Sequence, residues 1–310
     1  MASSVDESRE VGSLDLDALA TEAAHEPGTD YDLRSTLDLA VLMNAEDEAV
    51  PAAVAEATGQ IVVVIEAIAE SLRRGGRLIY VGAGSSGRIA ALDAAECEST
   101  FASPPGQVVA LLAGGLDASP LEQEAAEDDR EAGRRDVAGL ELRPEDVVVG
   151  ISASGRTPYV VAALEAAATA GAATACVVSV PESELEVVVE HPIVVVVGPE
   201  FLAGSTRLKA GTAQKLVLNM LSTISMIRLG KTFGNLMVDV VATNEKLRAR
   251  VRRIVRAATG APPDEVDAAL AAAGGEARVA IVSLLAGVGA DEARARLEKA
   301  GQSIRTAVDG

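Results

Sequence analysis

The chain has few aromatic residues and few residues of the kinds that bind metals. Among 310 residues, aromatic side chains make up 2%, tryptophan is absent, and there are only two cysteines and two histidines. So few aromatic side chains argue against a nucleic-acid platform on which bases stack. Neither a CxxC nor an HExxH pattern occurs, which argues against a His/Cys metal site. We expect no metal, and we expect Cys97 and Cys176 to be buried free thiols.

Basic residues are also scarce, with 27 Lys and Arg against 46 Asp and Glu and a formal net charge of -19. Such a surface repels nucleic-acid phosphates and anionic membranes. The first residues are polar and acidic, unlike a signal peptide, and the apolar stretches are interrupted before membrane-spanning length. We therefore expect a cytoplasmic protein that binds neither nucleic acid nor membrane. A bound phosphate would have to be held by local N–H groups and hydroxyls.

Hydrophobic residues make up 49% of the whole chain. Through its middle, apolar, β-branched segments alternate with helical ones. Helical patterns over 35–42 and 50–72 precede them, and the first part of residues 1–30 is predicted to be disordered. Strand and helix alternating in this way predict an α/β fold with a parallel sheet covered on both faces, a doubly wound sandwich. The five predicted strands are 77–81, 107–112, 146–151, 174–180 and 193–197.

The C-terminal part has a different pattern. A long helix is predicted over 213–229, and the run Thr259–Pro263 breaks the chain. Three short helices are predicted beyond it, over 264–273, 277–285 and 291–300. We therefore predict an N-terminal tail and helix (1–45), a main α/β domain (46–258) and a small helical domain (259–310).

The segment Gly82–Arg88 follows the first predicted strand and opens a helix. It matches G-x-G-x-x-G, the pattern of a dinucleotide-binding loop. That function requires an acidic residue about 20 positions further on, whereas Asp117 comes 30 positions after Gly87. Ser85 and Ser86, with the free N–H groups of a helix N-terminus, suit a compact anion site instead. Glycines that serve close packing alone are the remaining alternative.

Two further segments carry hydroxyls or charges after strands. Ser152–Thr157 follows the third predicted strand, and loops at the carboxyl ends of two strands meet in one crevice. Two such loops favour a small phosphorylated metabolite over a dinucleotide. In the segment 198–215, Arg207 suits a two-point anion clamp and Lys209 a point charge. Alternatively, both pair with nearby acids.

Three long segments, 78–97, 147–160 and 198–246, together resemble the N-acetylmuramic acid 6-phosphate etherase family of the sugar isomerase (SIS) fold group. The resemblance runs from about residue 30 to the C-terminus, and the mammalian glucokinase regulatory protein is similar over the same loops. It implies a SIS-type sandwich with a small, ubiquitin-associated-like helical domain. It also implies a homodimer, a small phosphorylated amino sugar as ligand, and no cofactor.

The family cleaves the lactyl ether of its sugar, giving D-lactate and N-acetylglucosamine 6-phosphate. One carboxylate removes the C2 proton, an acid protonates the departing lactate, and water then adds to the alkene. The resemblance implies Glu96 as the proton donor, late in the helix that starts at the first loop. It implies Glu127, in a polar helix predicted over 121–133, as the second acid. The implied substrate contacts are Ser85, Ser86, Ser152, Ser154, Arg207 and, more weakly, Lys209.

Two other functions fit the same loops. One is a non-catalytic sugar-phosphate sensor that regulates a partner protein, with the C-terminal helices as its docking surface. The other is a sugar-phosphate isomerase, a common activity in this fold group. Glutamates on helices of an acidic protein are often no more than solvated charges. The presence of both Glu96 and Glu127 at the family's positions favours the lyase.

Overall fold

The computed structural model describes residues 30–240 and 244–310, and a single parallel five-stranded sheet forms its centre. The strands are ordered β2-β1-β3-β4-β5, and every neighbouring pair is parallel. Their bounds are Leu78–Gly82 (β1), Val108–Leu112 (β2), Val147–Ile151 (β3), Ala173–Val178 (β4) and His191–Val194 (β5). The predicted α/β class and strand number are confirmed. The disorder predicted for the first part of residues 1–30 lies outside the described residues.

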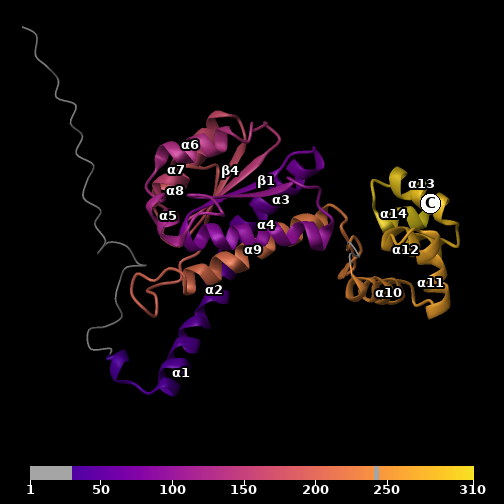
Figure 1. Ribbon diagram of the computed structural model, residues 1–310, viewed down its shortest axis with the longest axis horizontal. Helices are drawn as coiled ribbons and strands as arrows, with labels where there is room; N and C mark the ends of the chain where they lie inside the picture. The colour runs from indigo at the N-terminus through magenta and orange to yellow at the C-terminus, as the bar shows by residue number, and fades with distance from the viewer. Residues whose placement is uncertain (1–29, 241–243) are drawn as a thin grey trace, which may run out of the picture.

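Helices cover both faces of the sheet, which confirms the doubly wound arrangement (Figure 1). Because successive side chains of a strand point to opposite faces, Tyr80 belongs to one core and Ile79 to the other. The helices packed on the first face are α3 (Thr58–Arg73), α4 (Gly84–Phe101) and α9 (Lys209–Arg228). Those on the second face are α6 (Arg130–Ala138), α7 (Pro158–Thr169) and α8 (Glu184–Val188).

The strand order places a crevice beside β1. From β1 the chain first builds β2 on one side and then crosses to build β3 on the other. Sheets of this order bind ligands at the carboxyl ends of the two strands that flank the reversal. Here those ends are Gly82 and Ile151, which are paired with each other in the sheet. The first and second predicted loops follow directly from them.

Two predicted helices are each broken in two. The one predicted over 50–72 consists of α2 (Ala49–Glu56) and α3, because the helix is interrupted at Ala57. The one predicted over 121–133 consists of α5 (Pro120–Ala125) and α6, which are separated by a turn. Asp129 starts α6 by accepting a hydrogen bond from the backbone N–H of Ala132 at 2.9 Å. Glu127 therefore lies in a turn rather than on a helix, and that part of the prediction was wrong.

The C-terminal helices form a core of their own, so the predicted small helical part is confirmed (Figure 1). They are α11 (Pro263–Ala272), α12 (Ala277–Ala286), α13 (Ala290–Lys299) and α14 (Ile304–Asp309). The sequence predicted the first three of these but not α14, nor α10 (Glu245–Thr259) or the hairpin of β6 (Thr232–Phe233) and β7 (Leu236–Met237). Val251, Ile254 and Val255 of α10 belong to this C-terminal core. The domain division at residues 45/46 and 258/259 stays a prediction.

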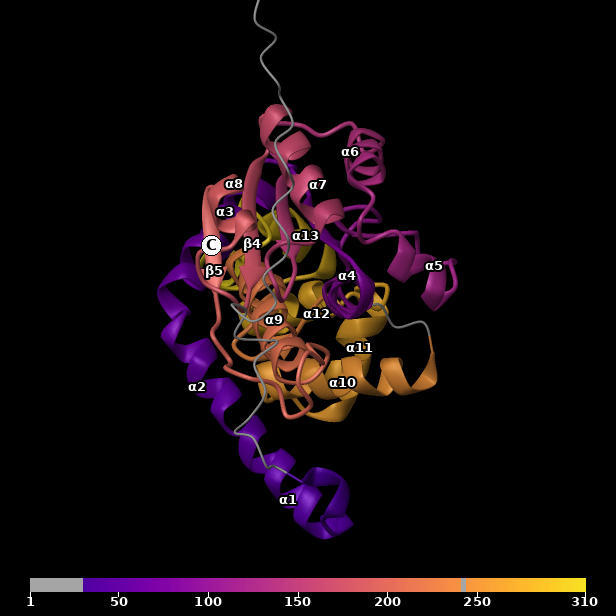
Figure 2. The same cartoon turned by 90° about the vertical axis from the view of Figure 1, so that its left-hand side faces the viewer.

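At the other end, α1 (Thr36–Asp47) leads away from the sheet (Figure 2). As predicted, the Ser35 hydroxyl caps it and accepts a hydrogen bond from the Asp38 N–H at 3.2 Å. No single helix in the described part of the chain is long and apolar enough to cross a membrane. Two bent helix pairs, 36–56 with 58–73 and 263–272 with 277–286, reach the required length and composition only when taken together.

Candidate functional site

The first loop leaves the N-terminus of α4 open. The helix starts at Gly84, and no side chain caps it. The N–H groups of its first turn have no partner within the helix, and together with the helix dipole they attract an anion. Ser85 and Ser86 belong to this turn and are partly exposed. Gly87 is needed for close packing, since a Cβ there would lie 2.3 Å from Cδ1 of Leu112.

Gly84 brings a carboxylate to this helix end. Its φ of +50° lies in the left-handed region, which favours glycine. A Cβ on Gly84 would lie only 2.5 Å from Oε1 of Glu127. The Glu127 carboxylate therefore rests directly on the backbone of the first loop. Glycine at position 84 supplies both the backbone conformation and the space.

Gly84→Ala is accordingly expected to displace the Glu127 carboxylate and strain the loop. We expect the variant to fold, because the added methyl meets the end of a side chain, and to lose most of its catalytic activity. Activity can be compared with that of Gly59→Ala, in which a Cβ would meet no atom within 4 Å. Equal activity of the two variants would contradict the placement of Glu127.

The turn that carries Glu127 is fixed from both sides. The Glu127 carbonyl accepts a hydrogen bond from the N–H of Tyr159, near the start of α7, at 3.0 Å. Gln123, on α5, accepts hydrogen bonds from Arg88 Nη2 at 2.8 Å and Nε at 3.1 Å. Its amide group donates to the Gly115 carbonyl at 2.9 Å. The turn is therefore attached to α4, to the loop after β2, and to the helix that follows the second predicted loop.

The surroundings of Glu127 raise its pKa and so make its carboxylate a stronger base than that of a free glutamate. Burial raises the pKa of this carboxyl, and the negative charges of Asp128 and Glu124 raise it further. The guanidinium of Arg88 acts in the opposite direction. A half-buried carboxyl with a raised pKa, placed against an anion-attracting helix end, has the properties of a proton-transfer group.

In the second loop, the serine hydroxyls bond within the loop itself. Ser152 is buried, and its Oγ lies 2.8 Å from Oγ1 of Thr157 and accepts from the Gly155 N–H at 3.1 Å. Ser154 is partly exposed, and its Oγ accepts from the Arg156 N–H at 3.3 Å. Ser152 therefore shapes the loop, while Ser154 and Thr157 lie closer to the surface. The resemblance to the family did not single out Thr157.

Arg156 is a second residue that was not among the implied substrate contacts. Its Nε is buried without a hydrogen-bond partner among the described residues. Burying an unpaired guanidinium N–H is costly, so such a group points to an interaction partner that arrives with a ligand. In the sequence, its position directly after Ser152-Ala153-Ser154-Gly155 could have indicated that it belongs to the second loop's site.

In the third segment, Lys209 and the N-terminus of α9 already have partners. The N-terminus of α9 is already occupied by Glu200, a buried side chain whose oxygens accept from the N–H groups of Lys209 and Ala210 at 2.8 and 3.0 Å. The Lys209 ammonium is also buried and bonds Glu46 at 2.7 Å. This favours the alternative in which Lys209 pairs with a nearby acid. Arg207 is exposed at the end of the loop.

Glu96 is on α4, as predicted, but on an exposed part of the helix and far from the first loop. Gly84, against which Glu127 rests, precedes it by 12 residues, which corresponds to about 18 Å along the axis at 1.5 Å per residue. The structure therefore brings Glu127 to the first loop and leaves Glu96 near the other end of α4. Cys97 beside it is buried, and burial raises the pKa of this thiol to about 12, so it is not a nucleophile.

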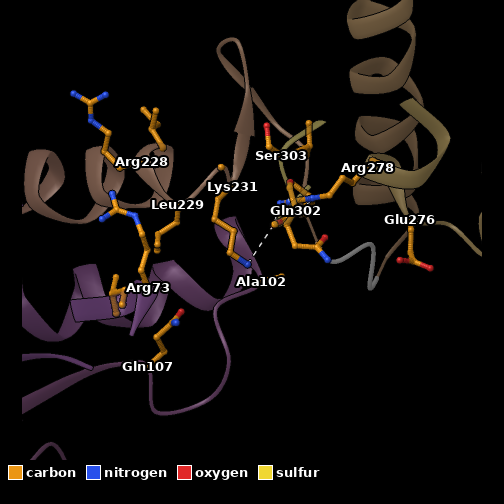
Figure 3. A pocket seen from close by; sticks show the side chains of 18 of the residues that line it. Arg73, Ala102, Gln107, Arg228, Leu229, Lys231, Glu276, Arg278, Gln302 and Ser303 are labelled. Carbon is orange, nitrogen blue, oxygen red and sulfur yellow. Dashed lines mark hydrogen bonds and ion pairs between the residues drawn. The ribbon is translucent and has the colours of Figure 1, made fainter. Parts of the chain in front are cut away.

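A cleft of about 1120 Å³ lies elsewhere, between the end of α9 and the C-terminal helices (Figure 3). Lys231, Arg278 and Gln302 are among its lining residues, and none of the predicted site residues lines it. Within residues 30–240 and 244–310, no group of three His, Cys, Asp or Glu side chains is placed to hold a metal ion.

Comparison with known proteins decides the family. Over 293 residues the chain is 57% identical to the N-acetylmuramic acid 6-phosphate etherase of Rubrobacter xylanophilus, covering 94% of this chain and 97% of that protein. The chain belongs to the N-acetylmuramic acid 6-phosphate etherase family. The etherase of Streptomyces coelicolor is 56% identical over the same length, 94% of each protein. The resemblance noted from the three segments is thus confirmed.

Two further similarities were found for this family member. Residues 60–168 match the family of the glucokinase regulatory protein N-terminal SIS domain. A solved phosphoheptose isomerase from Neisseria gonorrhoeae is 19% identical, with a TM-score of 0.49, and the match covers 62% of this chain and 98% of that one. The SIS match spans β1, β2, β3 and the loops that follow them.

Proposed function

We propose that this chain is an etherase that cleaves the lactyl ether of N-acetylmuramic acid 6-phosphate in the cytoplasm, releasing D-lactate and N-acetylglucosamine 6-phosphate. One observation carries the proposal beyond family membership: the Glu127 carboxylate rests on Gly84, at the open N-terminus of α4. An anion-binding helix end and a proton-transfer group thus lie side by side.

The phosphate of the substrate would bind at the start of α4. The N–H groups of the first turn and the hydroxyls of Ser85 and Ser86 would supply the donors, and Ser154 of the second loop would add a hydroxyl. Arg207 remains a proposed contact from its exposed loop. The N-terminus of α9 is a poorer choice, because the carboxylate of Glu200 already accepts hydrogen bonds from its N–H groups.

The two glutamates would divide the proton transfers. In the open-chain sugar, the C1 carbonyl acidifies the C2 proton, and ionised Glu127 removes it. As the C3–O bond breaks, Glu96 donates a proton to the oxygen of the departing lactate. Water then adds to C3 of the alkene while C2 regains a proton, which restores both carboxyl groups. This assignment requires one ionised and one protonated carboxyl group.

Within one chain, the length of α4 separates Glu96 from the glycine that Glu127 contacts. C2 and C3 are bonded neighbours, whereas Glu96 lies about 18 Å along α4 from the glycine that Glu127 contacts. We therefore propose that the chain works as a homodimer, in which Glu96 of one copy serves the loops and Glu127 of the other. Glu96 is exposed on α4 and so is accessible to a second copy.

The direct test is incubation of the purified chain with N-acetylmuramic acid 6-phosphate, followed by an enzymatic assay for D-lactate. We expect lactate and N-acetylglucosamine 6-phosphate in equal amounts. Absence of lactate at high protein concentration, in dilute buffer and in molar salt, would contradict the proposal. Sugar phosphates that raise the melting temperature without being consumed would instead indicate a sensor. Interconversion of sugar phosphates without lactate would indicate an isomerase.

A further inference from the structure

Lys215 of α9 carries an ammonium group with spare hydrogen-bonding capacity. It donates to Oδ1 of Asn219, one turn further along, at 2.7 Å. No other described residue accepts a hydrogen bond from it, and a third of its side chain is exposed. Because an ammonium group has three donors, the remaining ones can bind an acceptor that comes from outside the chain.

The nearest carboxylate does not occupy these donors. Oδ1 of Asp93 lies 3.8 Å from the ammonium nitrogen, which is too far for a hydrogen bond. Asp93 is buried and accepts hydrogen bonds from the hydroxyls of Tyr80 at 3.0 Å and Ser222 at 3.1 Å. It therefore attracts Lys215 and limits where the ammonium lies, while leaving its N–H groups available.

Lys215 lies beside Asp93, which is on α4 three residues before Glu96. Asp93 and Glu96 are three residues apart on α4, so they share one side of the helix. Burial raises the pKa of Asp93 and the pKa of Cys97. The negative charge of Glu96 raises both pKa values further, and the positive charge of Lys215 lowers both. Both charges thus act on the same two groups between α4 and α9.

The other cations on these two helices are held elsewhere. On α9, Lys209 is buried with Glu46, and Arg228 pairs with Glu66 at 3.4 Å. On α4, Arg88 bonds Gln123 near the first loop. Of the cations on α4 and α9, Lys215 is therefore the one that lies beside Glu96. The overall charge of the chain, -19, disfavours the binding of anions, so a local cation matters more.

The proposed substrate would bring a carboxylate to this place. The lactyl group carries its carboxylate on the carbon next to the ether oxygen, the atom that Glu96 would protonate. We propose that Lys215 binds the lactyl carboxylate and thereby distinguishes the substrate from sugar phosphates that lack a lactyl group. This inference rests on the proposed function and extends its site to α9.

The test measures binding in a Glu127→Gln background, so that the substrate is not consumed. N-acetylmuramic acid 6-phosphate, its lactyl methyl ester and N-acetylglucosamine 6-phosphate are titrated by calorimetry into this chain, with and without Lys215→Gln. Losing a charged hydrogen bond should weaken binding of the acid about 10- to 100-fold. We expect binding of the other two ligands to change little. Arg228→Gln, which removes a charge from the same helix, should leave all three affinities unchanged.

The methyl ester makes the result independent of how well the Lys215 variant folds. With Lys215 present, the ester should bind about 10- to 100-fold more weakly than the acid, and this difference should disappear in the Gln variant. Equal binding of ester and acid to the Lys215 chain would overturn the inference. So would an equal loss for all three ligands in a folded Gln variant. If the unmodified chain releases no lactate, the proposed function itself fails.

Discussion

Replacing Glu127 by glutamine is expected to slow lactate release about 100- to 10,000-fold, the usual contribution of a general acid–base group. Glutamine keeps the shape of the side chain that rests on Gly84 but cannot accept the C2 proton. The variant should still bind N-acetylglucosamine 6-phosphate, because the donors at the N-terminus of α4 are unchanged. Steady-state lactate assays and calorimetry on the same preparation measure both quantities.

Glu124 provides a matched control for this variant. It is an exposed residue on α5, and its charge is one of those that raise the pKa of Glu127. Because the base must be ionised, kcat/KM should fall as the pH drops through the raised pKa of Glu127. Glu124→Gln removes a nearby negative charge and should move this fall to lower pH while leaving the maximal rate close to that of the unchanged chain. Full activity in Glu127→Gln would remove Glu127 from the mechanism.

Two inactive variants are expected to restore activity when they are combined in one dimer. A hybrid pairs one Glu96→Gln chain with one Glu127→Gln chain, and the two can be co-expressed with different tags and purified through both. If Glu96 and Glu127 act across the interface, one of the two symmetric sites receives both intact glutamates. The hybrid should then show about half of the unchanged dimer's activity, while each parent stays inactive.

The reverse hybrid supplies the control. A chain carrying both substitutions is paired with an unchanged chain, so that each shared site contains one glutamine and should be inactive. A site built within one chain would give the opposite pattern, with half activity in this hybrid and none in the first. The lactate assay on the two purified hybrids therefore decides between a shared site and a site within one chain.

The sheet and the first loop were the most predictable features. Buried parallel strands are continuous apolar runs, so all five were found, and the glycines and serines after β1 indicated the open end of α4. The end of β5 was misplaced, since Ile193–Val197 is apolar throughout but only His191–Val194 pairs with β4. Pairing partners, rather than composition, determine where an edge strand ends.

The position of Glu127 in a turn could not be predicted from the local sequence. No glycine or proline interrupts residues 121–132, so a continuous helix was expected there. The break comes from the cap supplied by Asp129 and from the hydrogen bond between the Glu127 carbonyl and Tyr159 of α7. The second of these is a tertiary contact. The position of Glu96, by contrast, agrees with the sequence: it was expected late in the helix that starts at the first loop, and α4 runs without a break from Gly84 to Phe101.

The continuity of α4 also constrains how this family can vary. An α-helix turns by about 100° per residue, so the direction in which Glu96 points is set by the number of residues that separate it from Gly84. Inserting or deleting one residue would keep the helix, both glutamates and both loops, yet it would rotate Glu96 away from its side of the helix. The segment between them should therefore accept changes of side chain much more readily than changes of length.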